Sequence, residues 1–141
     1  AKPVPINPGR LRNPKRDSAM IAAAGPIANF TLAAIAGLLF RFGILPLSLN
    51  NVLSGLIYYL VMINVGLGIF NLIPIPPLDG WKVLQGFMPS EIAYKMMRME
   101  YANPMITWLI LGLFIISPLP ELIIGIPFSF LVRLFTTPLG Y

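Results

Sequence analysis

The sequence lacks two residue types on which much of protein chemistry depends. Its 141 residues include no cysteine and no histidine. Without cysteine there is no disulfide framework and no thiolate metal site, and without histidine the commonest metal ligand and the commonest general base are missing. These 141 residues alone therefore cannot carry histidine-based metal binding or catalysis.

Charge is also scarce. Charged residues make up 11% of the chain, where soluble proteins carry about a quarter, and 57% of the residues are hydrophobic. Several apolar stretches approach the roughly 20 residues that a helix needs to cross a bilayer. The composition excludes an ordinary soluble domain and predicts an all-α integral membrane protein, a single polytopic transmembrane helix bundle with segments broken by proline and glycine.

The first 17 residues differ from the rest of the chain. They contain four prolines and five basic residues, Lys2, Arg10, Arg12, Lys15 and Arg16, against one acid. We expect an extended or turn-rich linker, since each proline fixes φ and lacks an N–H donor. A basic arm could also bind nucleic acid or anionic lipid. Its place directly before an apolar span favours a cytoplasmic linker that follows the positive-inside rule, without a nucleic-acid partner.

The first predicted transmembrane helix covers residues 19–42 and is rich in alanine. Small residues let helices approach closely in lipid, so this span should lie inside the bundle. Gly25 and Pro26 are expected to interrupt it about one turn from its start. Asn29 places an amide at membrane depth, where it needs a hydrogen bond to a neighbouring helix or to a substrate.

A second span is predicted at residues 52–73, followed by less regular segments. The loop before it has no Lys or Arg, whereas Lys82, Lys95 and Arg98 follow it, so the chain should return there to the cytoplasmic side. The pattern of residues 90–101 predicts a short interfacial helix. Residues 105–135 should form C-terminal hydrophobic helices, either one tilted span with a surface helix or a hairpin of two short helices.

The stretch NLIPIPPLDG, residues 71–80, ends the second span with three prolines and one acid, Asp79. Asp79 has three possible roles: a solvated turn residue, a protonated or paired carboxylate inside the bundle, or a metal ligand. Prolines keep a chain extended and remove backbone donors, which is tolerated at membrane depth only where the segment is buried in protein or lines a cavity. An ionisable residue there is a functional candidate.

These residues resemble the site-2 protease family of intramembrane zinc metalloproteases. The family carries an asparagine, proline-spaced apolar residues and then Leu-Asp-Gly at the end of a transmembrane helix, matched here from Asn71 to Gly80. The preceding span of the family has a glycine–proline–x–x–asparagine element, matched by AGPIANF, residues 24–30. The proline-rich opening is similar to the linker before that span in bacterial members.

The resemblance implies that Asp79 is the third protein ligand of a catalytic zinc ion. The two histidine ligands and the glutamate base would come from an H-E-x-x-H helix, which this sequence lacks. We therefore expect a C-terminal portion of a longer protein whose missing N-terminal segment carries that helix. Alone, the 141 residues contain no catalytic residue and should be inactive, because one carboxylate cannot hold a catalytic zinc.

For the whole protein, the resemblance implies hydrolysis of peptide bonds in or near the transmembrane helices of substrate proteins. Asn29 and Asn71 would be candidates for binding the substrate backbone or the oxyanion, with helix-to-helix hydrogen bonds as the alternative for each. The expected location is the bacterial inner membrane, with the linker and Asp79 towards the cytoplasm. One alternative is a catalytically inert scaffold subunit of a larger membrane complex. A transporter half would require a second, similar repeat, which the sequence does not show.

Overall fold

The chain folds into helices throughout the part described by a computed structural model, which covers residues 14–48 and 50–138. Most of the predicted linker, residues 1–13, lies outside the described residues. The helices are α1 (Pro14–Arg41), α2 (Val52–Leu72), α3 (Asp79–Phe87), α4 (Ser90–Ala102), α5 (Pro104–Ile116) and α6 (Leu119–Thr136). No strand occurs among these residues, so the predicted all-α class is confirmed.

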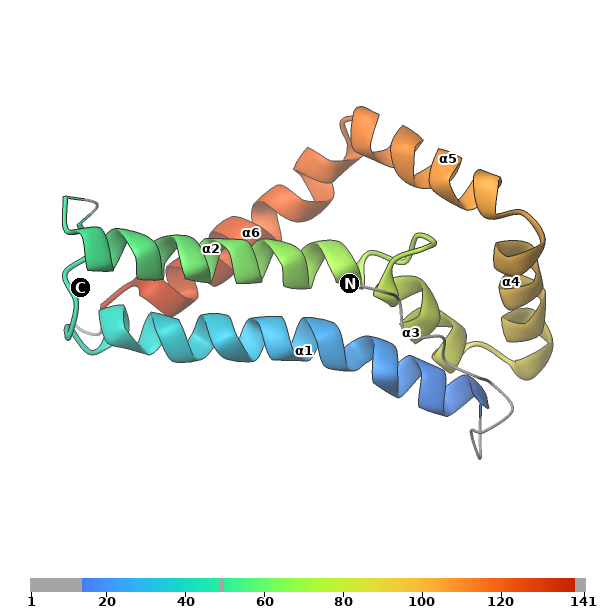
Figure 1. Cartoon of the computed structure of the whole chain (residues 1–141), viewed down its shortest axis with the longest axis horizontal. Helices are drawn as coiled ribbons and strands as arrows, with labels where there is room; N and C mark the ends of the chain where they lie inside the picture. Colours follow the sequence, from blue (N-terminus) through green and yellow to red (C-terminus); the bar gives the residue numbers. More distant parts are fainter. Residues whose placement is uncertain (1–13, 49, 139–141) are drawn as a thin grey trace.

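The centre of the bundle is formed by α1 and α2, which lie side by side, with α6 packed against both (Figure 1). Buried alanines of α1 meet buried valines of α2: Ala33, Val61 and Val65 are all fully buried. Alanine at such an interface lets two helix backbones approach closely, which is the main way to gain packing in lipid. The core therefore consists of small and β-branched side chains, namely Ala33, Ala36, Val61, Val65, Ile69 and Val132.

Two glycines set the closest approaches between these helices. A Cβ atom at Gly68 of α2 would lie 2.7 Å from the ring of Phe30 on α1. A Cβ atom at Gly37 of α1 would lie 2.7 Å from the backbone oxygen of Phe135 on α6. Real Cβ contacts are not this short, so a larger residue at Gly37 would push α1 and α6 apart, whereas a larger residue at Gly68 would first displace the ring of Phe30.

The remaining helices form an arch at one end of the bundle. Figure 1 shows α3 beside the first half of α1, with α4 and α5 leading away from it and back towards α6. A second apolar cluster joins α5 to the link between α2 and α3; it consists of Ile73, Leu78, Leu111 and Phe114. The link between α2 and α3 is thus packed against α5.

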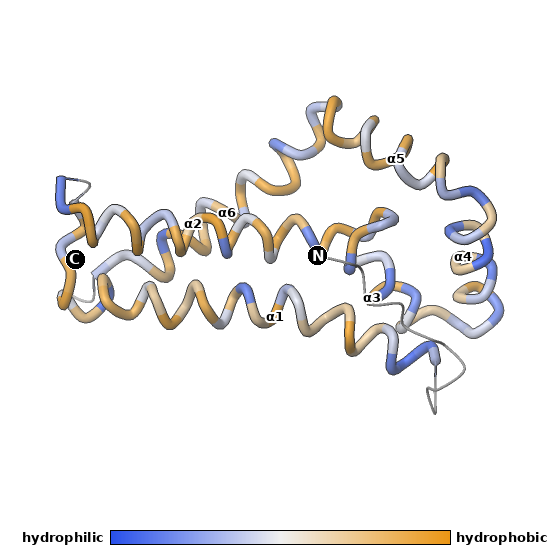
Figure 2. Tube along the Cα trace, in the orientation of Figure 1, coloured by the Kyte–Doolittle hydropathy of each residue, from blue (hydrophilic) through white to orange (hydrophobic). Residues whose placement is uncertain are grey.

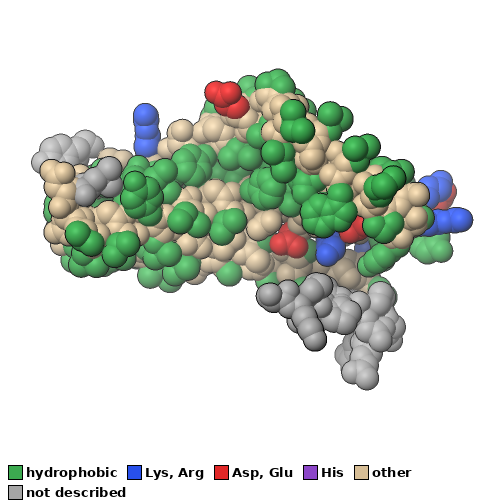
Figure 3. Space-filling view, turned by 45° about the horizontal axis from the view of Figure 1, so that its top comes forward, with side chains coloured by type: hydrophobic (Ala, Val, Ile, Leu, Met, Phe, Trp, Pro, Cys, Tyr) green, Lys and Arg blue, Asp and Glu red, His purple; other side chains and the backbone are tan. Residues whose placement is uncertain are grey.

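Three helices of the described chain, α1, α2 and α6, are long and apolar enough to cross a membrane. The pair α4 and α5, bent by 95°, would make a fourth if it counts as one broken span. Hydrophobic residues dominate α1, α2, α5 and α6, and α4 is the most hydrophilic helix (Figure 2). Hydrophobic side chains also cover most of the face shown in Figure 3. Large exposed apolar surfaces of this kind belong in lipid, so the chain is an integral membrane protein.

Two local predictions about α1 are wrong. Residues 14–17 were expected to be extended but are helical, because Pro14 occupies the first helical position, where its missing N–H costs nothing. Gly25 and Pro26 do not interrupt the helix, which runs continuously through both. A proline removes one hydrogen bond from a membrane helix, and packing against neighbouring helices keeps the helix in place; Pro26 is buried.

The other predicted ranges correspond to observed helices. Their positions relative to a membrane stay predictions. Residues 52–73 match α2, and residues 90–101 match α4, where an exposed Lys95–Glu91 pair bridges one helical turn at 2.8 Å. Residues 105–135 divide into α5 and α6 around Ser117 and Pro118. The interfacial location of α4 and the membrane topology of the last two helices stay predictions.

The contact between α1 and α6 can be tested at Gly37. We expect Gly37→Ala to lower the free energy of unfolding by about 1–3 kcal/mol, because the new methyl group overlaps the backbone of α6. Gly112→Ala on α5 is the matched control, since a Cβ atom there meets nothing within 4 Å. Denaturant titration in detergent micelles measures both values, and equal stability of the two variants would contradict this packing.

Candidate functional site

The link between α2 and α3 carries the prolines, and it satisfies its own backbone donors. Residues 73–78 have three N–H groups, because Pro74, Pro76 and Pro77 have none. Ile73 donates to Phe70 O, Ile75 to Ile73 O and Leu78 to Ile75 O, at 2.8–3.2 Å. The peptide bond between Pro76 and Pro77 is cis. The prolines thus allow an irregular segment at membrane depth, because they leave no backbone N–H in the link without a partner.

Asp79 is the first residue of α3 and directly follows this link. Its side chain is partly buried rather than fully solvated. In the described part of the chain its carboxylate has neither a hydrogen-bond donor nor an ion-pair partner. Its helix position is favourable, since the N-terminus of a helix attracts negative charge.

Asp79 lies against the glycine of the other sequence motif. A Cβ atom at Gly25 of α1 would be 3.2 Å from Asp79 Oδ2. The two motifs, 54 residues apart in sequence, therefore meet in space. Gly25 leaves room for the carboxylate beside α1, and a side chain at this position would compete with it.

Gly80 fixes the other side of Asp79. A Cβ atom there would lie 2.1 Å from Leu72 O and 2.5 Å from Ile73 O, so α3 begins in direct contact with the backbone at the end of α2. Only glycine fits this approach. The glycine is needed here for close backbone contact inside a helix and not for a left-handed turn, because its φ is not positive.

The two asparagine candidates belong to the same region. Asn29 lies one turn after Gly25 on α1, and Asn71 lies one turn after Gly68 on α2, whose partner across the interface is Phe30. Neither asparagine side chain has a hydrogen-bond partner among residues 14–48 and 50–138. Asn64, in contrast, donates to Leu60 O at 2.9 Å within its own helix. The helix-to-helix bonds considered for Asn29 and Asn71 are absent from this part of the chain.

Trp81 adds a polar group that sequence reasoning missed. Its indole Nε1 is buried and, within the described residues, has no hydrogen-bond partner. A buried donor without an acceptor costs about 1–3 kcal/mol. The only signal in the sequence was its position two residues after Asp79, which does not reveal burial. Asp79 and Trp81 lie in the first turn of α3, Asn71 lies in the last turn of α2, and Asn29 lies one turn after Gly25 on α1.

Asp79 is a suitable ligand for a metal ion, but the described residues do not form a complete metal site. A carboxylate oxygen is a normal zinc ligand, and a catalytic zinc uses three protein ligands plus water. Across the described residues, no three histidine, cysteine, aspartate or glutamate side chains are grouped closely enough to hold a metal ion. The chemistry of Asp79 fits zinc, but these residues do not complete a zinc site.

Comparisons with known proteins agree on one family. The model of peptidase family M50 matches residues 42–116, which include Asn71 and Asp79 but not Asn29. "Putative zinc metalloprotease YwhC" of Bacillus subtilis is 30% identical over 71% of this chain and 48% of its own length. "Zinc metalloprotease MJ0392" of Methanocaldococcus jannaschii is 31% identical over 57% of this chain and 23% of its length.

A streptococcal relative shows the same relation over a shorter region. "Putative zinc metalloprotease SPs1691" of Streptococcus pyogenes is 35% identical over 49% of this chain and 16% of its own length. The chain thus spans about half the length, or less, of these curated relatives. No solved structure matches it significantly.

The different neighbours of Gly80 and Gly25 lead to a prediction. Gly80→Ala should lower the free energy of unfolding by about 3 kcal/mol, because its methyl group meets fixed backbone atoms. Gly25→Ala should cost less than 1 kcal/mol, because the Asp79 carboxylate can move by a few tenths of an ångström. Thermal unfolding of both variants in the same detergent measures the difference. If Gly80→Ala is as stable as wild type, α3 does not start against α2 as described.

Proposed function

Because this chain belongs to peptidase family M50, the site-2 protease family, we propose that it is the portion of an intramembrane zinc metalloprotease that supplies Asp79 to the metal. The observation that carries the proposal is the environment of Asp79: a partly buried carboxylate, unpaired in the described chain, held between Gly25 and the end of α2. An unpaired carboxylate at membrane depth costs free energy unless it binds a cation or a hydrogen-bond donor.

The remaining zinc ligands would come from outside these 141 residues. In this proposal an H-E-x-x-H segment of the full-length protein brings two histidines and a glutamate base to Asp79. In metalloproteases, bound zinc activates a water molecule and polarises the scissile carbonyl group. This chain would hold one ligand in place and would be inactive alone, since it has no histidine.

Asn29 and Asn71 would bind the substrate in this proposal. An extended peptide at membrane depth exposes backbone groups that need partners, and two amides without partners in the described chain can provide them. An amide N–H₂ directed at the developing oxyanion would also stabilise the transition state. The substrate class would be peptide segments in or near the transmembrane helices of other proteins.

The distribution of basic residues supports an orientation with Asp79 towards the cytoplasm. Figure 1 places the start of α1 near α3 and α4, at one end of the bundle. That end carries Lys15, Arg16, Lys82, Lys95 and Arg98. The opposite end has Arg41 and Arg133, near the ends of α1 and α6. By the positive-inside rule the richer end would face the cytoplasm, in the inner membrane if the source is bacterial.

Asp79→Asn tests the ligand role. In full-length protein, we expect zinc content and proteolytic activity to fall and membrane insertion to stay intact. The fall should exceed roughly 10- to 100-fold, which is the typical effect of removing a residue that hydrogen-bonds to a metal ligand. Elemental analysis of purified protein and cleavage of a reconstituted membrane substrate measure the two effects. Glu91→Gln, which changes an exposed carboxylate on α4, is the matched control. Full zinc content in Asp79→Asn would defeat the assignment.

Asn29→Ala and Asn71→Ala test the substrate roles separately. Each should keep zinc content and lower activity, with a loss of about 10²-fold if the amide stabilises the oxyanion. Asn64→Ala is the control, because Asn64 already bonds within its own helix. Unchanged cleavage in both variants would remove the two asparagines from the site.

The alternative, an inert scaffold subunit, makes a different prediction for the same preparations. A scaffold would show no zinc and no cleavage in wild-type protein, and Asp79→Asn would change only assembly with its partners. Intact mass spectrometry of the natural protein distinguishes the two at once, because the protease requires an H-E-x-x-H segment in the same polypeptide.

A further inference from the structure

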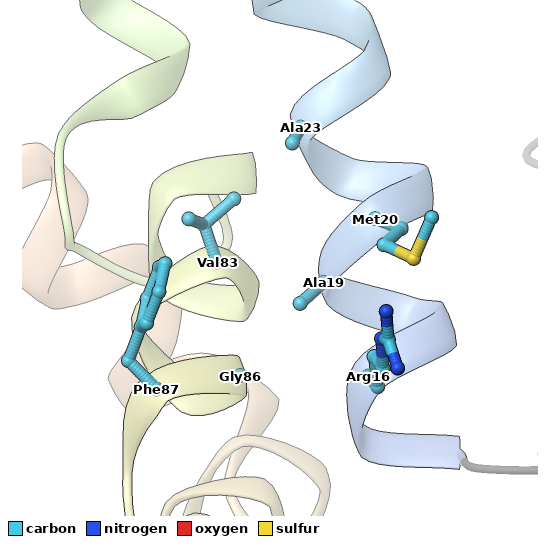
Figure 4. A pocket seen from close by; sticks show the side chains of 7 residues that line it. All are labelled: Arg16, Ala19, Met20, Ala23, Val83, Gly86 and Phe87. Carbon is cyan, nitrogen blue, oxygen red and sulfur yellow. The ribbon is translucent and has the colours of Figure 1, made fainter.

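A groove separates the first turns of α1 from α3, outside the site around Asp79. Its volume is about 220 Å³. Ala19 and Ala23 of α1 face Val83 and Phe87 of α3 across it, and Arg16 lies at its edge (Figure 4). The Phe87 side chain is 82% exposed, which is unusual for so large an apolar group unless something other than water covers it.

Small residues create this groove. A Cβ atom at Gly86 would lie 2.4 Å from the Ala19 methyl group, so the two helices touch there. Ala23, one turn further along α1, is too short to fill the space in front of Val83. Lys15 also donates to Met88 O, which ties the start of α1 to the end of α3. The groove is therefore held open by fixed backbone on both sides.

Its size decides between possible occupants. An apolar cavity of about 150 Å³ holds benzene, so 220 Å³ accommodates on the order of nine carbon atoms. One turn of a helix with side chains, about 10 Å across and 5.4 Å long, needs roughly 400 Å³. The groove can therefore enclose part of a hydrocarbon chain, but it cannot enclose a full helical turn.

Its charge decides between possible headgroups. Arg16 lies where the apolar wall ends, and Lys15 precedes it on the same helix. Basic residues at the end of a membrane helix attract anionic lipid headgroups, and pockets between helices that carry them bind phosphate. Arg16 is an exposed residue that also lines this apolar groove, so an anionic headgroup beside it would meet a positive charge.

We infer that this groove binds one acyl chain of an anionic phospholipid, with the lipid phosphate at Arg16. The methylene groups lie against Ala19, Ala23, Val83 and Phe87. The site is distinct from Asp79 and requires no metal, so it stands or falls independently of the proposed protease activity. Its effect is to join the start of α1 to α3 through a bound lipid.

The test uses full-length protein reconstituted in nanodiscs of phosphatidylcholine, with and without phosphatidylglycerol, and native mass spectrometry of retained lipids. Arg16→Gln should lower the preference for phosphatidylglycerol about fivefold. Ala23→Leu fills the groove and should lower retention of either lipid more than tenfold, since each buried methylene group contributes to binding. The controls are Arg98→Gln on α4 and Ala28→Leu on the exposed side of α1.

The controls and one further measurement make the test decisive. If Arg98→Gln reduces the preference as much as Arg16→Gln does, the effect is a general surface potential and the site is overturned. A photoreactive benzoylphenylalanine in place of Phe87 should form a covalent adduct with lipid. An adduct with a peptide, whether a substrate or residues 1–13 of this chain, would show that the groove has another occupant and would overturn the lipid assignment.

Discussion

The close contact between the start of α3 and the end of α2 is the constraint on which the site depends. Gly80 lies so near Leu72 O that no side chain fits between them. This contact sets Asp79 against Gly25, and α3 then continues along α1 in the same direction as α2 (Figure 1). The three prolines in the link have no N–H group, and each N–H that remains is bonded to a carbonyl oxygen of the link or of the last turn of α2.

Close packing of α1 against α2 also positions the region around Asp79. Glycine and alanine at the α1–α2 interface bring the two backbones close together where the ring of Phe30 packs against Gly68, one residue after Asn29 and three residues before Asn71. In lipid, where apolar surface gains little from burial against another helix, such close packing is the main source of association. The core therefore consists of small and β-branched residues.

Much of this arrangement could be predicted from the sequence, because it depends on local chemistry. The scarcity of charge and the length of the apolar runs predicted the helical membrane class, and the motifs around Asp79 and Gly25 identified the family. The sequence could not predict that Pro26 leaves α1 unbroken, since that depends on neighbouring helices. Contact between Gly25 and Asp79, and burial of the Trp81 indole, depend on tertiary packing and were likewise not visible.

The central claim is that Asp79 is held ready for a metal ion whose other ligands lie beyond these residues. The most direct measurement is an experimental structure of the full-length protein with zinc bound. The account predicts an Asp79 carboxylate oxygen about 2.0–2.2 Å from the zinc ion, beside Gly25. A zinc ion bound without Asp79, with its side chain turned to bulk water or paired with a basic residue, would contradict the account.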